Sequence, residues 1–263
     1  MGSATREALA SARAALTALS GANLATGEEL FAASRVIGSS SQLVQAVADP
    51  GADSAAKVAL VDSVFSSLSA PVRELLRGIA VSRWSSQEDV LAAIEELGLR
   101  AIAASAPSGA AIEQELFAFG EAVAGNAELE LALSNKLGDP VAKSTLVASL
   151  LGGKASAQTT AIVNQLVLQP RGRRIGELLR YAASVVADEA GFGIATVTSA
   201  GPIAPAQLQR LAAALSGSYG RELRINQVVD PAVLGGLRVQ IGDDVIDGSI
   251  ASRLNDVRIQ LAS

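Results

Sequence analysis

The chain has 263 residues, of which 49% are apolar and only 3% aromatic, and its 26 acidic and 21 basic residues give a net charge of −5. It contains no histidine and no cysteine, which excludes disulfides, thiol nucleophiles, imidazole bases and the softest metal ligands. The mild acidic balance gives no general attraction for nucleic acid. The length and composition favour two modest domains with cores of alanine, leucine, valine and isoleucine.

Neither the N-terminus nor the longest uncharged run predicts a membrane-spanning segment. The sequence MGSATREALA lacks the basic segment and long apolar core of a signal peptide. Residues 190–209 are uncharged but contain three glycines and two prolines, which disfavour a membrane helix. We therefore expect no direct membrane insertion, and contact with a membrane only through a partner.

Residues 4 to about 190 have alanine and leucine at helical spacing, interrupted by short polar stretches. This pattern predicts a succession of helices. Two candidate capping boxes mark helix starts, Thr26 with Glu29 and Ser85 with Glu88. In GDPVAKSTL, Asp139 is expected to cap a helix whose first residue is Pro140.

A shift of 86 residues aligns residues 53–65, DSAAKVALVDSVF, with residues 139–151, DPVAKSTLVASLL, and six of thirteen positions are identical. The alternatives are a true duplication and a coincidental pattern in an alanine-rich chain. We favour duplication, with a helical bundle in residues 1–107 and a second, partial copy in residues 108–190.

The pattern changes after residue 190, and residues 191–263 are predicted to form a small α+β domain. Residues 193–200 and 222–230 are rich in β-favouring side chains, and a helix between them begins at Pro205. Two further β-like runs, LRVQIG and VIDG, meet at a Gly-Asp turn. The predicted fold class is therefore mostly α, with a bundle, a partial second copy and a small α+β C-terminal domain.

The aspartates of the last segment, Asp243, Asp244 and Asp247, could supply hard oxygen ligands for a metal. They lack the alternating ligand spacing and distal glutamate of a calcium loop, so we interpret them as residues of a turn. Asp247 or Ser249 would then cap a final helix. The glycines of LLGGKAS and GFGIAT do not complete a phosphate-binding motif, and we predict no cofactor, metal or catalytic residue.

Three other sets of side chains have alternative interpretations. The paired glutamates Glu28, Glu29, Glu95 and Glu96 are expected on solvated helix faces. The arginines Arg171, Arg173, Arg174 and Arg180 are either solvated or meet an acidic partner. Trp84 is either a core residue or an interface anchor.

Residues 228–261 closely resemble the end of the delta subunit of bacterial F-type ATP synthase, the homologue of the mitochondrial oligomycin-sensitivity-conferring protein. The matching residues are Asp230, Pro231, Gly235, Gly236, Gly242, Asp243, Ile246, Asp247, Gly248, Ser249, Arg253 and Leu254. ATVTSAGPIAPAQLQRLAAAL and QPRGRRIGELL are also similar to the family, with Arg173 on the family's arginine. The N-terminus departs from the family pattern. The chain is also longer than the usual family member, by about the length of one repeat.

This resemblance implies a non-catalytic stator subunit that links the alpha/beta catalytic head to stalk subunit b and resists rotor torque. It implies a peripheral position at the cytoplasmic face of the cell membrane, within the synthase complex, and no cofactor. The alternative from composition alone is a free-standing helical scaffold or adaptor unrelated to the synthase.

The resemblance also implies that the first and fifth helices of the bundle form a groove for an N-terminal helix of an alpha subunit. The first helix, residues 4–19, would contribute Leu9, Leu16 and Leu19. The fifth would be residues 71–83, with Leu75, Leu76 and Ile79, or residues 157–169, with Ile162, Leu166 and Val167. All of these could equally be core residues. We favour the first copy, because it follows the first helix directly and closes a complete bundle.

Overall fold

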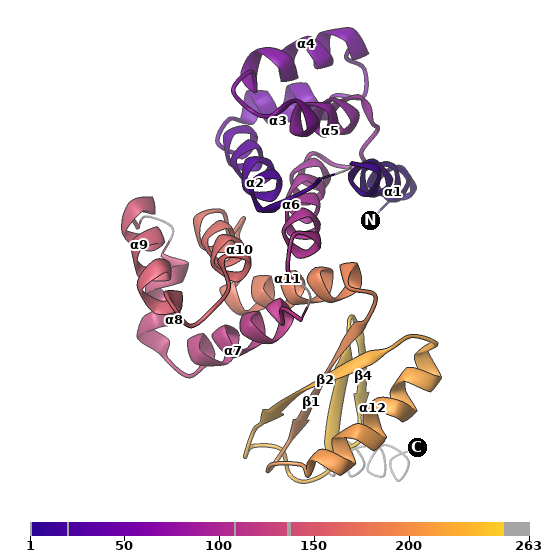
Figure 1. Cartoon of the computed structure of the whole chain (residues 1–263), viewed down its shortest axis with the longest axis vertical. Helices are drawn as coiled ribbons and strands as arrows, with labels where there is room; N and C mark the ends of the chain where they lie inside the picture. The colour runs from indigo at the N-terminus through magenta and orange to yellow at the C-terminus, as the bar shows by residue number, and fades with distance from the viewer. Residues whose placement is uncertain (1, 20, 108, 136–137, 250–263) are drawn as a thin grey trace, which may run out of the picture. The chain divides into compact units, whose positions relative to one another are not determined.

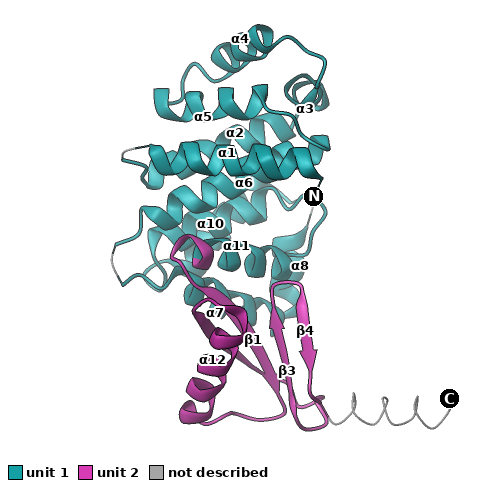
Figure 2. Cartoon of the chain, turned by 90° about the vertical axis from the view of Figure 1, so that its right-hand side faces the viewer, with its two compact units in different colours: residues 1–186 teal, residues 187–263 magenta. Residues whose placement is uncertain are grey.

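The computed structural model describes residues 2–19, 21–107, 109–135 and 138–249 (Figure 1). It divides into two compact units, residues 1–186 (unit 1) and residues 187–263 (unit 2), coloured separately in Figure 2. The described residues form twelve helices and one four-stranded sheet. The chain is therefore mostly α with a small C-terminal α+β region, as the sequence predicts.

All the regular secondary structure in the described residues of unit 1 is helical. The first six helices are α1 (Ser3–Ala18), α2 (Leu24–Gly38), α3 (Ser41–Ala48), α4 (Ser54–Val64), α5 (Ala70–Val81) and α6 (Gln87–Ala104). They are followed by α7 (Ile112–Ala124), α8 (Ala127–Ser134), α9 (Pro140–Leu151), α10 (Ala157–Leu168) and α11 (Ile175–Glu189). The last of these helices continues past the boundary between the units.

The helix starts follow the capping chemistry of the sequence, with two corrections. The Asp139 carboxylate caps α9 by accepting hydrogen bonds from the N–H groups of Val141 and Ala142. The capping box of α2, however, starts at Asn23 and places Thr26 at its third helical position. The cap of α6 is Ser86, one residue after the predicted Ser85. Asn23 and Ser86 both have the extended backbone that a cap requires.

Contacts in unit 1 recur at a spacing of 86 or 87 residues. The Glu29 carboxylate accepts hydrogen bonds from the N–H and hydroxyl of Ser69, which precedes α5. The Glu115 carboxylate accepts the same two bonds from Ser156, which precedes α10. Helices α3 and α8 have corresponding bounds, and their caps, Ser40 and Asn126, are also 86 residues apart.

Helix α6 is the most buried helix of unit 1. Every residue from Ala93 to Ile102 is buried, including charged ones. It crosses α2 closely through Gly27 and Gly98, since a Cβ on Gly27 would lie 2.8 Å from the carbonyl oxygen of Gly98. Helix α6 also contacts α1, α3, α5 and α10, so apolar residues surround it on several sides.

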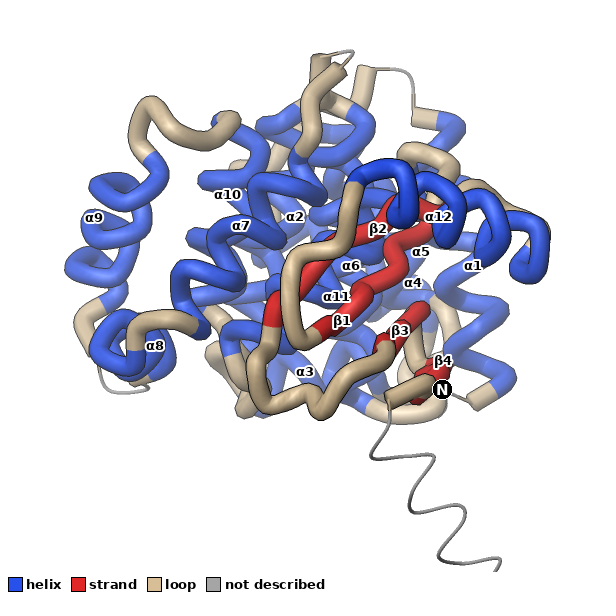
Figure 3. Tube along the Cα trace, turned by 90° about the horizontal axis from the view of Figure 1, so that it is seen from below, coloured by secondary structure: helices blue, strands red, loops and turns tan. Residues whose placement is uncertain are grey.

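Unit 2 contains β1 (Gly193–Ser199), α12 (Pro205–Tyr219), β2 (Leu223–Val229), β3 (Leu237–Ile241) and β4 (Asp244–Asp247). The strand order is β2-β1-β3-β4, with β1 and β2 parallel and the other pairs antiparallel. Figure 3 shows the four strands side by side with α12 next to them. Leu215 of α12 packs with Ala195, Val197, Leu223 and Val239 to form the core of this unit.

Candidate functional site

The structure brings together two of the three predicted sets of groove residues. Leu9 and Leu16 of α1 belong to the same buried cluster as Leu75, Leu76 and Ile79 of α5, and Leu19 packs against it. Helix α1 contacts both α5 and α6 (Figure 2). The side chains are largely buried, so a partner helix would meet this cluster only along the rim between α1 and α5.

The third predicted set, Ile162, Leu166 and Val167 of α10, is fully buried or nearly so. It lies outside the described cluster that joins α1 and α5. Helix α2 contacts α10. Arg35 donates a hydrogen bond to the side-chain carbonyl oxygen of Gln165. Ser34 donates one to the side-chain carbonyl oxygen of Gln169, which follows α10, at 3.0 Å. The amide of Gln169 in turn donates to the carbonyl oxygen of Ser34 at 3.0 Å.

Small residues lie on the exposed surfaces of α1 and α5. Arg13 of α1 pairs with Glu96 of α6, and the exposed Ser11 and Ala15 lie on the other flank of α1. Arg77 of α5 pairs with Asp62 of α4. Gly78 of α5 is exposed, and no atom lies within 4 Å of the position of a Cβ there.

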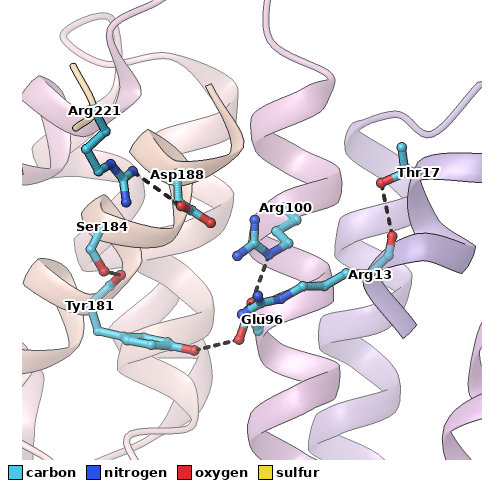
Figure 4. A network of polar contacts seen from close by, with 8 residues as sticks. All are labelled: Arg13, Thr17, Glu96, Arg100, Tyr181, Ser184, Asp188 and Arg221. Carbon is cyan, nitrogen blue, oxygen red and sulfur yellow. Dashed lines mark hydrogen bonds and ion pairs between the residues drawn. The ribbon is translucent and has the colours of Figure 1, made fainter. Parts of the chain in front are cut away.

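A buried glutamate joins three helices of unit 1. The Glu96 side chain, 4% exposed, accepts hydrogen bonds from Arg13 Nε at 2.7 Å and from Arg100 Nε at 2.8 Å. The hydroxyl of Tyr181 donates to it at 3.5 Å (Figure 4). The pKa of Tyr181 lies well above its usual value because of burial and the neighbouring carboxylates of Glu96 and Glu95, so its phenol remains a donor. Glu96 therefore links α1, α6 and α11.

Its neighbour Glu95 joins α6 to the segment between α10 and α11. Its fully buried Oε1 pairs with Arg171 Nη2 at 2.9 Å and Arg173 Nη2 at 2.7 Å. The guanidinium of Arg173 also lies 5.5 Å from the ring centroid of Tyr181. Oε2 of Glu95 and Nε of Arg171 are buried and have no hydrogen-bond partner within the described residues.

The prediction that Glu95 and Glu96 are solvated was therefore wrong. It assumed that no apolar enclosure surrounds these glutamates, whereas α6 contacts several other helices. The sequence contained a signal for this, since VLAAIEELGLRAIAA is apolar around the whole helix and charges inside such a helix must be paired. Of the four arginines, Arg171 and Arg173 pair with Glu95, whereas Arg174 and Arg180 are exposed.

Trp84 is a core residue and is only 8% exposed. It belongs to the cluster of α1 and α5, and its Nε1 donates to the carbonyl oxygen of Ile79 at 2.8 Å. This agrees with the first of its two interpretations.

The Gly- and Asp-rich motif of the C-terminal segment forms a hairpin. Strands β3 and β4 pair antiparallel, and the turn between them contains Gly242 at φ 58° and Asp243. Gly236 at φ 81° lies against the backbone of Gly248 and Ser249, with 2.9 Å between its Cβ position and the Cα of Ser249. The Gly-Gly pair and the Asp-Gly-Ser run are thus two sides of one contact that a side chain would block.

The aspartates of this segment make turn contacts. Asp230 Oδ1 accepts a hydrogen bond from the N–H of Ala232, and Asp247 Oδ1 accepts one from the N–H of Ser249, each at 2.9 Å. Hydrogen bonds from the hydroxyl and the N–H of Ser249 lower the pKa of Asp247. The described residues contain no cluster of three or more acidic, histidine or cysteine side chains arranged for a metal. Gly235, at φ 74°, adopts the left-handed backbone that glycine favours. The predicted final helix, with Arg253 and Leu254, lies outside the described residues.

Comparison with known proteins gives the family of this chain. Residues 98–261 match the model of the ATP synthase delta (OSCP) subunit family. The chain belongs to this family. Delta (OSCP) subunits are structural parts of ATP synthase and components of its peripheral stalk. Among the described residues, no helix is both long and apolar enough to cross a membrane.

The similarity to delta subunits extends through the N-terminal residues that precede the family match. The ATP synthase subunit delta of Leifsonia xyli subsp. xyli is 59% identical over 263 residues, which cover 100% of both chains. That of Streptomyces avermitilis is 40% identical over 268 residues, covering 99% of this chain and 98% of its own. The long N-terminal region is therefore a feature of these delta subunits too.

Proposed function

We propose that this delta-type subunit is a non-catalytic stator component that links the alpha/beta head to stalk subunit b at the cytoplasmic face of the membrane. In this role it resists the torque of the rotor. The observation that carries the proposal is the full-length match to delta subunits together with the family match over residues 98–261. The helical surface of unit 1 offers places for partner helices, and unit 2 would contact the stalk.

The helical region consists of two copies of one helical set that share α6. Helices α2–α6 correspond to α7–α11, and their first residues are shifted by 86 to 88 residues. The repeated caps and glutamate–serine contacts support this correspondence. Helix α6 would end the first bundle and begin the second, which accounts for its burial and for the start of the family match at residue 98. The domains would be residues 1–107, 108–190 and 191–263.

The first copy provides the groove for the alpha subunit, between α1 and α5. Helix α10, the counterpart of α5, carries Ile162, Leu166 and Val167, and α2 is already hydrogen-bonded to its side chains through Gln165 and Gln169. The α1–α5 rim, with Ser11, Ala15 and Gly78, has small side chains over an apolar cluster.

An amphipathic partner helix would lie along this rim with its apolar stripe toward Leu9, Leu16, Leu19 and the α5 set Leu75, Leu76 and Ile79. This is helix-in-groove recognition, in which small residues allow close approach of the partner backbone. The binding energy would come from covering apolar area, at about 25 cal/mol per Å².

Titration of a peptide with the alpha-subunit N-terminal helix into the full chain tests the groove. Ala15→Glu places a charge on the rim and should weaken binding at least tenfold. The matched control is Ala10→Glu, the same change at an exposed position on the other side of α1. Alanine and glutamate have similar helix propensities, so neither change should unfold α1. Equal affinity of both variants and the wild type would contradict the groove.

The alternative, a scaffold unrelated to the synthase, makes a different prediction for purification. A stator subunit should purify with the alpha, beta and stalk subunits, whereas a free scaffold should not. Absence of these subunits from a gently purified, tagged full chain would count against the proposed function.

A further inference from the structure

A cavity of about 320 Å³ lies in unit 1, beside the start of α9 and the end of α10. It is lined by Gly138, Pro140, Lys143, Leu168, Pro170, Arg171 and Gly172. Two of these residues carry positive charge, and none carries negative charge. None of them belongs to the groove proposed for the alpha subunit.

Lys143 lines this cavity, and its ammonium has no partner among the described residues. It is 8% exposed, and the described residues provide its side chain with neither a hydrogen bond nor an ion pair. Its counterpart in the first copy, Lys57, is 5% exposed and donates to the carbonyl oxygens of Val47 and Ala80, both at 2.9 Å. Lys143 Nζ is not one of the enclosed side-chain atoms that lack a partner, so it reaches open space at the cavity and can meet a ligand, whereas the ammonium of Lys57 is bonded inside the fold.

Arg171 gives the cavity a second unusual cation. It is the one residue other than glycine with positive φ, 47°, in the part of the chain that the structure describes. Such a backbone persists where the surroundings hold it, often at functional sites. Its Nη2 pairs with Glu95, but its buried Nε has no partner among the described residues.

The first copy fills the corresponding position with an apolar side chain. The segment between α5 and α6 places Trp84 in the core, with its Nε1 bonded to Ile79. The segment between α10 and α11 instead has Pro170, Arg171 and Gly172, which line a cavity. The second copy therefore has a charged residue, Arg171, beside a cavity where the first copy has the buried Trp84.

The nearby carboxylates are already engaged. Asp139 accepts hydrogen bonds from the N–H groups of Val141 and Ala142 at the start of α9. Glu95 is shared between Arg171 and Arg173. Among the described residues that line the cavity, the charged ones are Lys143 and Arg171, and both are positive.

We propose that this cavity binds a phosphate group, either inorganic phosphate or the terminal phosphate of a nucleotide. Lys143 would contribute its free ammonium, and the two glycines leave space for the oxygens close to the backbone. Phosphate suits the site because its several oxygens can accept bonds from a lysine and an arginine at once. The site is distinct from the proposed stator contacts and does not depend on them.

Isothermal titration of the full chain at constant ionic strength tests this site, with inorganic phosphate, ADP and ATP as separate ligands. The wild type should bind at least one of them saturably, and which one binds identifies the source of the phosphate. Lys143→Met should weaken that affinity at least tenfold. Lys154→Met, the same change at an exposed lysine of the second copy, should leave it unchanged.

A second variant guards against loss of folding in Lys143→Met. Pro140→Glu adds a negative charge at the cavity, while an acidic residue in the first turn of a helix is favourable for α9. It should weaken binding to a similar extent in a protein that remains folded by circular dichroism. The proposal is overturned if no phosphate compound binds the wild type, or if Pro140→Glu binds as tightly as Lys154→Met.

Discussion

The close crossing of α2 and α6 makes Gly27 a sensitive test of the packing of unit 1. A Cβ at residue 27 would lie 2.8 Å from the Gly98 carbonyl oxygen and would also overlap Ile102. A backbone oxygen cannot rotate away, so the helices must separate. Overpacking costs about 1–3 kcal/mol, and we take about 3 for a backbone obstacle. Replacing glycine by alanine in a helix contributes about 1 kcal/mol in favour.

Gly27→Ala should therefore lower the free energy of unfolding by about 2 kcal/mol. For unit 1, residues 1–186, this corresponds to a fall in melting temperature of about 4–8 °C. The matched control is Gly78→Ala, since no atom lies within 4 Å of that Cβ position. The control should raise the melting temperature by about 2–4 °C. Scanning calorimetry measures both, and a rise in both variants would refute the close crossing.

Two further predictions concern Glu95 and Glu115. Glu95→Gln leaves Arg171 and Arg173, whose side chains are 18% and 33% exposed, without their counter-charge. It should lower the free energy of unfolding in urea by about 3 kcal/mol. A smaller loss than in an exposed control such as Glu128→Gln would contradict the buried ion cluster. The pKa of Glu115 is lowered from 4.5, because hydrogen bonds from Ser156 and Thr159 outweigh burial, which alone would raise it. The charged form of Glu115 therefore stabilises the folded state above pH 4.5, and this stabilisation is lost as the pH falls through the folded-state pKa. Glu115→Gln should flatten this part of the pH–stability curve. An unchanged slope would contradict the assignment.

Local rules predicted much of the fold from the sequence. Pro140 after Asp139 fixes the start of α9, and Pro205 with Gly220 bounds α12. The Gly242–Asp243 turn fixes the register of β3 and β4. These helix ends and this turn depend on residues close together in the chain, so a short stretch of sequence is enough to predict them.

The interior of unit 1 was harder to predict, because it depends on which helices share a surface. Glu96 bonds to Arg13, 83 residues away, and Tyr181, 85 residues away. No periodicity within α6 shows that both partners converge on it. The groove residues illustrate the same limit, since Leu75 and Leu166 have similar helical patterns, but only Leu75 shares a cluster with α1.

The central proposal is that the first copy holds the alpha subunit between α1 and α5. A photo-reactive amino acid placed at Ala15 in the assembled synthase tests this most directly, with a second probe at the exposed Ala148 of α9 as the comparison. Our account predicts crosslinks from residue 15 to the N-terminal segment of an alpha subunit and none from residue 148. Crosslinks to that segment from residue 148 alone would contradict it.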